Sequence, residues 1–201
     1  MDKMPKELIL ASGSPRRRAL LEGLNLSFRV MTSHVDETLP PDIKPKDAVQ
    51  NLALKKAKAV SISASSALII GADTVVVLDE QILGKPTDVQ DAMQMIAQLQ
   101  GRVHHVFSGI ALVEVEEGKI VREITRARKT DVWMRPLSQK KIDWYIRTGE
   151  PLDKAGAYGI QGYGATLIEK MDGCYFNVVG LSLSLLDQMM EELGYFMFHD
   201  F

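Results

Sequence analysis

The sequence predicts an α/β protein, because short apolar runs typical of strands alternate along it with segments of helical periodicity. Its 201 residues can bury one good core or two small lobes that share a sheet. Apolar residues make up 46% of the chain and charged residues 25%, as in ordinary globular proteins. No repeat, low-complexity segment or linker interrupts the pattern, so we expect one domain over residues 1–201, with two lobes around one sheet.

The first half of the chain contains the clearest strands and helices. Strands are predicted over residues 7–11, 28–32 and 67–78, and helices over 16–23 and 47–64. Asp47 is the expected N-cap of the second helix. The third strand is expected to be interrupted at Gly71-Ala72-Asp73-Thr74. Asp79-Glu80-Gln81 should then turn the chain into a hairpin, with weak turn chemistry because no glycine supplies a positive φ.

The second half alternates in the same way. A helix should start at Thr87 or Asp88 and end near Gly101, and Ser138 should cap another that reaches Gly149. The remaining predicted elements are paired strands over 105–114 and 119–134, a glycine-rich tract over 156–164, and an amphipathic helix over 179–193.

Charge and cysteine content exclude several classes of protein. The net charge of −2 argues against a general nucleic-acid binder, which would be strongly basic. Cys174 is the only cysteine, so no intrachain disulfide can form, and a reducing, cytoplasmic location is expected. No stretch approaches the length of a membrane span, and no membrane partner is expected. His104 and His105 are adjacent, so on a strand they would face opposite sides and make a poor metal site.

The most informative segment joins the first strand to the first helix. Ser14 is a good N-cap, and Pro15 suits the first helical position, where its missing N–H is not needed. Three arginines, at residues 16–18, follow in the first turn, where the helix dipole disfavours cations unless an anion compensates. Free backbone N–H groups, small residues and guanidinium groups together indicate a phosphate site, although a solvated basic helix end is the plainer alternative.

Acids and lysines elsewhere could complete such a site. Asp73 lies between two apolar strand runs, where a carboxylate is costly unless it is paired, metal-bound or at a cleft; a turn aspartate is the alternative. Asp36-Glu37, Lys56 and Lys85 are each unremarkable alone, as solvated surface residues. Together they suit Mg²⁺ and a polyphosphate, because Mg²⁺ typically takes one or two carboxylates plus phosphate oxygens. Phosphoanhydride hydrolysis is favoured over kinase action, since no P-loop or kinase motif is present.

The glycine-rich tract offers a place for a planar ligand. It lacks the Gly-x-Gly-x-x-Gly fingerprint of dinucleotide folds, but its glycines allow close backbone approach. The Gln161 amide has both a donor and an acceptor, which suits reading a base edge, although it could equally be a plain loop glutamine.

Taken in order, these pieces resemble the Maf family of nucleoside triphosphate pyrophosphatases. The matching segments cover nearly the whole chain: Ala11-Ser12-Gly13-Ser14-Pro15-Arg16-Arg17, Asp36-Glu37, residues 53–57 with Lys56, Gly71-Ala72-Asp73-Thr74, Gly84-Lys85-Pro86, residues 154–162 and Asn177-Val178-Val179-Gly180-Leu181. The joint match is specific, although each fragment is weak. The resemblance implies a mixed, twisted α/β sheet flanked by helices in a Maf- and ITPase-like fold, with a cleft between two lobes and commonly a homodimer.

The resemblance also implies an activity and the residues that perform it. A nucleoside triphosphate would be cleaved between its α and β phosphates, giving a monophosphate and pyrophosphate, with a divalent metal cation (Mg²⁺ or Mn²⁺). Asp73 matches the catalytic proton acceptor, and Glu37 with Asp73 would hold the metal. The phosphate-handling positions match Ser12, Arg16, Arg17, Lys56 and Lys85, and the positions linked to substrate choice match Arg16, Thr74 and Gln161.

Within the family, Gly-Ile-Gln-Gly at 159–162 together with Arg16 resembles the dTTP/UTP branch. A house-cleaning enzyme acting on canonical or modified pyrimidine triphosphates is therefore our first hypothesis. One alternative is a 7-methyl-GTP pyrophosphatase, whose branch typically carries Lys-Ser-Glu-Gly in this tract. Another is a regulator of cell division that binds nucleotide without turnover. The complete set of acids and lysines argues against this alternative. Asp79-Glu80 departs from the Asn-Gly-like turn expected for the family.

Overall fold

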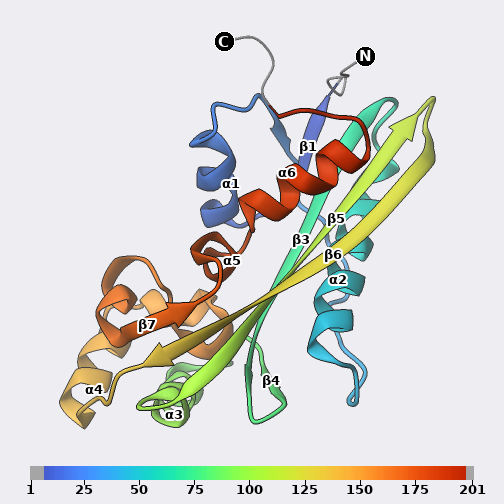
Figure 1. Ribbon diagram of the computed structural model, residues 1–201. Coiled ribbons are helices and arrows are strands. Elements are labelled where there is room, and N and C mark those ends of the chain that lie inside the picture. The colour runs from blue at the N-terminus through green and yellow to red at the C-terminus, as the bar shows by residue number, and fades with distance from the viewer. Residues whose placement is uncertain (1–6, 198–201) are drawn as a thin grey trace. The chain divides into compact units, whose positions relative to one another are not determined.

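The computed structural model of the protein describes residues 7–197 (Figure 1). These residues form two compact units, each treated by itself below. Unit 1 contains the chain up to Asp73, residues 108–128 and the chain from Gly180 onward. Unit 2 contains residues 74–107 and 129–179. No helix within residues 7–197 has the length and apolar character needed to cross a membrane.

Seven strands of the described chain form a mixed sheet, with the order β2-β1-β3-β5-β6-β7 and β4 paired to β3. β1 is parallel to β2 and β3, whereas β4 is antiparallel to β3 and β7 to β6. The predicted mixed α/β sheet is thus confirmed. The strands are β1 (Leu8–Ala11), β2 (Arg29–Val30), β3 (Ala67–Leu78), β4 (Gln81–Leu83), β5 (Val103–Glu116), β6 (Lys119–Met134) and β7 (Ile168–Asp172). The α-helices are α1 (Pro15–Glu22), α2 (Pro45–Ser61), α3 (Val89–Leu99), α4 (Gln139–Arg147), α5 (Tyr175–Val179) and α6 (Leu183–Glu192).

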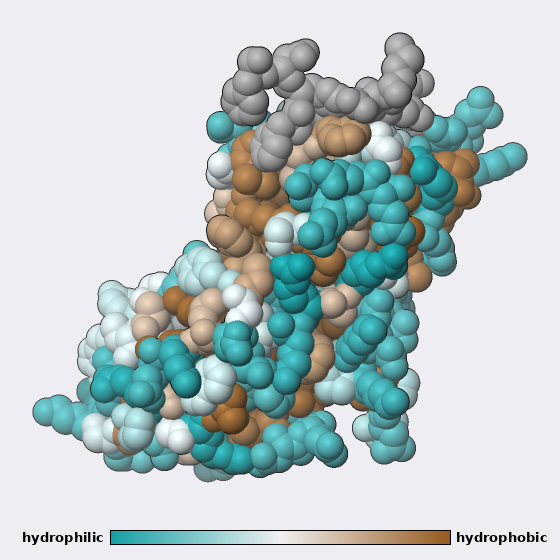
Figure 2. Space-filling view, viewed as in Figure 1, coloured by the Kyte–Doolittle hydropathy of each residue, from teal (hydrophilic) through white to brown (hydrophobic). Residues whose placement is uncertain are grey.

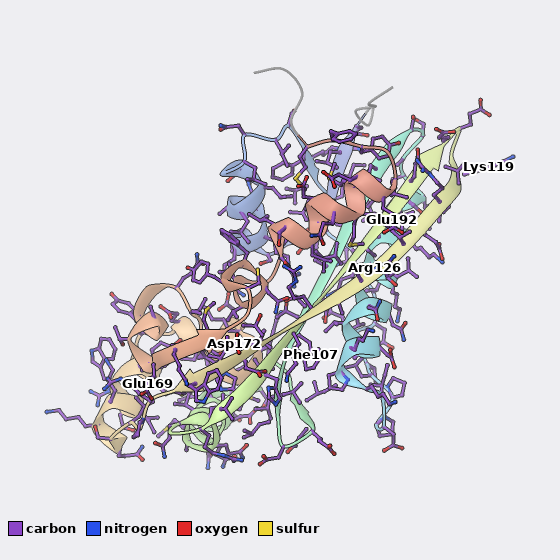
Figure 3. The ribbon with its side chains drawn as sticks, viewed as in Figure 1. Phe107, Lys119, Arg126, Glu169, Asp172 and Glu192 are labelled. Atoms are coloured by element: carbon purple, nitrogen blue, oxygen red, sulfur yellow. The ribbon has the colours of Figure 1, made fainter. Side chains whose placement is uncertain are left out.

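In unit 1, helices cover both faces of the strands. Alternate strand residues point to opposite faces, so Leu10 packs with side chains of α1 and α6, while Ile9 packs against α2 (Figure 1). Polar side chains gather on the outward face of α6 (Figure 2). Arg126 of β6 and Glu192 of α6, whose Nη2 and Oε1 atoms are 3.0 Å apart, form an ion pair on this side (Figure 3).

Two glycines let α2 approach the sheet unusually closely. A Cβ at Gly71 of β3 would lie 2.0 Å from the Ala53 carbonyl oxygen, and one at Gly109 of β5 would lie 2.3 Å from that of Val49. Val49 and Ala53 are one turn apart on α2, so the same face of the helix rests on both strands. Any side chain at either glycine would push the helix away.

Unit 2 has its own hydrophobic core. α3 and α4 pack together on residues of the strands, with Ile96, Val106 and Tyr145 among the most buried. Three 3₁₀ turns, Glu150–Asp153, Ala155–Ala157 and Gly162–Leu167, follow α4. The second and third of these turns overlap the glycine-rich tract predicted over 156–164.

Several predicted elements differ in detail from the structure. β3 is continuous through Gly71–Thr74, because the glycine is accommodated against α2 rather than used in a turn. Lys44, not Asp47, occupies the N-cap of α2, since Pro45 takes the first helical position; Asp47 lies in the first turn. β2 has only two residues.

The predicted last helix over 179–193 starts later than expected, at Leu183, and is preceded by a separate short helix, α5, that was not predicted. α5 ends at Val179 and α6 starts at Leu183, because Gly180 adopts φ 127°, a conformation incompatible with a helix. The β3–β4 hairpin does form, with Asp79 at φ 48° and Glu80 at φ 67°. Asp88 and Ser138 cap α3 and α4, as predicted.

Candidate functional site in unit 1

The carboxyl end of β1 lies beside the middle of β3, at the edge where the parallel pairing of the two strands stops. Ala11 lies opposite Gly71, so Ser12 and Asp73 both follow shortly after the last paired residues. The Ser14 side chain accepts a hydrogen bond from Arg17 N (3.5 Å), and Pro15 opens α1. The predicted strand, cap and proline-led helix are therefore confirmed. This strand edge is where open α/β sheets usually bind ligands.

Arg17 points back from α1 to the loop that precedes it. Its Nη1 donates to Ser12 Oγ (3.1 Å), and its Nε donates to the Gly180 carbonyl oxygen (2.9 Å). Burial lowers the pKa of Arg17, with a smaller lowering from Arg16, while Asp73 and Glu37 raise it. The guanidinium group thus lies within the electrostatic influence of both acids.

The third arginine of the motif is not part of this arrangement. Arg18 Nε is 2.7 Å from Glu22 Oε1, one turn later on the same helix, and both side chains are exposed. Arg17 and Arg18 therefore have different surroundings, and Arg16 and Arg17 remain the candidates for phosphate.

Lys56 connects two acids that are distant in sequence. Its Nζ lies 2.6 Å from Asp73 Oδ1 and 3.0 Å from Glu37 Oε1. Lys56 and Asp73 are buried, with 8% and 6% of their surface exposed. The glycine contact explains this geometry: Gly71 and Asp73 share a strand face, and Ala53 and Lys56 are i,i+3 neighbours on α2. Where α2 touches Gly71, Lys56 reaches Asp73.

The adjacent acids at 36 and 37 have different surroundings. The Asp36 carboxylate accepts hydrogen bonds from Thr38 N (2.9 Å) and Thr38 Oγ1 (2.6 Å), which lower the pKa of Asp36. Lys55 donates to the Asp36 carbonyl oxygen. Asp36 therefore shapes the turn, and Glu37 is the acid that reaches Lys56.

Asp73 and Glu37 are suitable ligands for a divalent metal. Both contact the same ammonium group, so a cation there could be shared between them. Within residues 7–197 no group of three or more His, Cys, Asp or Glu side chains could hold a metal ion. Mg²⁺ needs only one or two carboxylates when substrate phosphates and waters supply the other ligands, so the pair fits.

The other predicted site residues belong to unit 2. Thr74 follows Asp73 directly in β3, and Lys85 is exposed just after β4. Gly156 N donates to the Gly84 carbonyl oxygen (3.0 Å), which ties the Lys85 loop to the glycine-rich tract. Gln161 is exposed in that tract. That these residues meet those of unit 1 around one substrate stays a prediction.

Glu150 and Tyr145, which organise the glycine-rich tract, were not predicted from the sequence. Glu150 accepts hydrogen bonds from Tyr163 N (2.8 Å), Gly164 N (2.9 Å) and the Tyr145 hydroxyl (3.0 Å). A glutamate after Gly149 and before Pro151 reads as a simple loop residue, and nothing local indicates its partners.

His104 and His105 do face different surroundings, as predicted. His104 is buried, with Nε2 2.6 Å from the Tyr158 hydroxyl, and its buried Nδ1 has no hydrogen-bond partner among the described residues. Burial, with a smaller contribution from His105, lowers the pKa of His104 to about 4. His105 lies beside Asp131, with 2.6 Å between Nδ1 and Oδ1. The two imidazoles therefore have separate hydrogen-bond partners.

Comparison with known proteins identifies the relatives of the chain. A family model described as Maf-like protein matches residues 7–193. The chain belongs to the Maf family. A relative from Dictyoglomus thermophilum, named dTTP/UTP pyrophosphatase, is 47% identical over 193 residues, covering 96% of this chain and 98% of its own. A Maf-family relative of the same name from Pelotomaculum thermopropionicum is 47% identical over 190 residues, covering 94% and 98%.

A solved structure is also similar to the chain. The Ham1 protein of Staphylococcus aureus has a TM-score of 0.47 and 14% sequence identity, covering 81% of this chain and 80% of its own. This likeness is too loose to bear on the chemistry of the Maf-family chain.

Proposed function

We propose that this chain hydrolyses nucleoside triphosphates, dTTP and UTP among them, to the monophosphate and pyrophosphate. The observation that supports this most directly is the buried Lys56 between Asp73 and Glu37, beside the helix start that carries Arg16 and Arg17. The names of the relatives that are 47% identical over nearly the whole chain support pyrimidine triphosphates as substrates.

In this proposal, Asp73 is the proton acceptor that prepares water for attack on the α phosphorus. A largely buried carboxylate can take a proton from water when the nearby cations also hold the phosphates. Arg16, Arg17, Lys56 and, from unit 2, Lys85 would neutralise the triphosphate. Ser12 keeps the Arg17 guanidinium in place through its hydrogen bond.

Asp73 and Glu37 would also hold a divalent metal, Mg²⁺ or Mn²⁺. Such a metal, when bound, acts as a Lewis acid on the phosphate oxygens. Lys56 would then exchange its carboxylate partners for phosphate oxygens. Thr74 and Gln161, with Arg16, are the proposed determinants of base choice. A homodimer and a cytoplasmic location stay predictions from the sequence.

The test is an Asp73→Asn variant assayed with UTP and dTTP, with identification of the products. We expect kcat to fall by about 10² to 10⁴-fold, because an amide cannot accept the proton. The exposed Asp42→Asn is the matched control and should retain turnover. Wild-type turnover in Asp73→Asn would refute the proposed role of Asp73.

The products and substrate preference separate the alternatives. Monophosphate and pyrophosphate are expected; diphosphate and inorganic phosphate would mean cleavage at the other anhydride. Faster turnover of 7-methyl-GTP than of UTP would favour the methylated-purine enzyme. Nucleotide binding without metal-dependent hydrolysis would favour a regulatory protein.

A further inference from the structure

We propose that Glu150 is a positioning residue for substrate choice. Its carboxylate fixes the backbone of the tract over residues 159–164, and that tract presents Gln161 to the nucleotide base. The inference rests on the proposed function, in which Gln161 reads the base, and it concerns unit 2 alone. Glu150 itself need not touch the substrate.

Three donors converge on the two carboxylate oxygens. Oε2 accepts from Tyr163 N, and Oε1 accepts from Gly164 N and from the Tyr145 hydroxyl, all within 2.8–3.0 Å. The same hydroxyl accepts from Gly159 N (3.2 Å). Backbone groups on both sides of Gln161 are thus bound, directly or through one hydroxyl, to one acid.

The tract is also built closely around this acid. A Cβ at Gly162, where φ is 64°, would lie 2.5 Å from Glu150 Oε2. A Cβ at Gly164 would lie 2.2 Å from the Gly159 carbonyl oxygen and 3.0 Å from Glu150 Oε1. The glycines therefore allow the backbone to wrap the carboxylate, which side chains at 162 and 164 would prevent.

Glu150 and its partner Tyr145 are themselves fixed by contacts with other residues of unit 2. Tyr145 is fully buried in the core of unit 2, Lys154 Nζ donates to the Glu150 carbonyl oxygen (2.6 Å), and Glu150 N donates to Thr148 Oγ1 (3.2 Å). The Gln161 side chain, by contrast, is exposed and makes no hydrogen bond to another residue in 7–197. The position of Gln161 therefore depends on the backbone of the tract, and the position of that backbone depends on its hydrogen bonds to Glu150.

A carboxylate is needed at this position because every partner is a donor. In Glu150→Gln, one oxygen would become an NH₂ group facing a backbone N–H or the hydroxyl, so at least one donor would lose its acceptor. The phosphate-handling residues of unit 1 would be unaffected. Loosening the tract should therefore weaken base recognition and leave the chemical step nearly unchanged.

The experiment compares Glu150→Gln with Glu169→Gln, a matched control on β7 whose exposed side chain is labelled in Figure 3. Hydrogen exchange of the amides of Tyr163 and Gly164 should be at least about 10-fold faster in Glu150→Gln, because hydrogen bonds to a charged acceptor are lost. KM for UTP and dTTP should rise about 10-fold with kcat within about twofold, and the proposed preference for UTP over 7-methyl-GTP should shrink. Tyr145→Phe should change the same quantities in the same direction, by less. Glu169→Gln should match wild type.

Faster exchange with unchanged KM and unchanged preference would overturn the inference, since Glu150 would then be only structural. Unchanged exchange would also overturn it. To separate this from the proposed function, the Kd for UTP is measured in the Asp73→Asn background with and without Glu150→Gln. If the wild-type protein shows no turnover but Glu150→Gln still weakens UTP binding, the proposed function is wrong and the inference is supported. Absence of UTP binding would end both.

Discussion

Lys56 brings a positive charge into a mostly buried position where two carboxylates share it. Asp73 is similarly buried, so each of these charges depends on the other for its low energy in the folded state. Glu37, with about half of its side chain exposed, contributes less, because water screens it. The candidate site is therefore also a determinant of stability in unit 1.

Replacing Lys56 with Met should lower the free energy of unfolding by about 3 kcal/mol, because it leaves Asp73 buried without its ammonium partner. Adding Asp73→Asn should restore part of that loss, so the two effects will not be additive. Urea unfolding of the single and double variants measures the coupling. The exposed Lys55→Met is the control, with a loss under about 1 kcal/mol. Equal losses in the two lysine variants would contradict the buried pair.

Among single residues, sequence reasoning identified those whose neighbours along the chain are informative. Asp73 could be singled out because apolar strand residues on both sides make a carboxylate costly. Ser14 and Pro15 carry an explicit helix-start signal. Glu150 and Tyr145 could not be found this way, because their partners at 159–164 become neighbours only on folding.

At the scale of elements, the β3–β4 hairpin shows how a turn can form without its preferred residues. Both central residues, Asp79 and Glu80, have positive φ, which costs an ordinary residue about 1 kcal/mol or more. Asp79 gains a contact in compensation, since both of its carboxylate oxygens are 2.7 Å from Arg102 Nη2. No comparable side-chain bond is present for Glu80 in the described part of the chain.

Glu80→Gly should therefore raise the free energy of unfolding by about 1 kcal/mol, because Asp-Gly is a favoured pair for this kind of turn. The thermal midpoint is the measurement. Gln81→Gly, one residue later at the start of β4, should instead lower it, since glycine weakens a strand. A lower midpoint for Glu80→Gly would show that the positive φ is not the source of strain.

Element boundaries were predictable where a cap or glycine marks them, as at α1, α3 and α4. The continuity of β3 through Gly71 was not. In a sequence, Gly-Ala-Asp-Thr within a strand looks like a turn, whereas in the fold the glycine meets a helix from elsewhere in the chain. The last helix was predicted to start too early, at Val179 rather than Leu183, because apolar residues continue on both sides of Gly180.

For the molecule as a whole, stability should depend on pH through His104. The pKa of His104 is about 4 in the folded state, below the ordinary value of 6.5. Between these values the unfolded chain binds a proton that the folded chain does not. The contribution of His104 to the free energy of unfolding is therefore fully present above about pH 6.5 and is lost as the pH falls toward 4. The loss is at most about 1.4 kcal/mol per pH unit.

The proposed pH dependence from His104 is tested by measuring the free energy of unfolding at pH 7.5 and at pH 5. Wild type should lose more stability over the interval than His104→Gln, which lacks the titrating group. His34→Gln, altered at an exposed histidine elsewhere in the chain, is the control. Equal pH dependence in wild type and His104→Gln would contradict it.

The fold class, the first strand with the helix that follows it, and the family were accessible from the sequence, because they depend on local signals along the chain. The two units were expected only as lobes around one sheet. Their segments alternate along the chain, and β3 passes from one unit to the next between Asp73 and Thr74. Local patterns do not reveal such a division, since a strand that serves two cores has the same apolar sequence as one that serves a single core.

Because α2 rests closely on Gly71 and Gly109, the geometry of the candidate site in unit 1 also depends on the absence of side chains at these two positions. A screen for inactive variants should therefore recover uncharged substitutions such as Gly71→Ala alongside losses of the acids and lysines. Such variants would keep every ionisable group, but α2 would be displaced from the sheet and the Lys56 ammonium group would be moved away from Asp73.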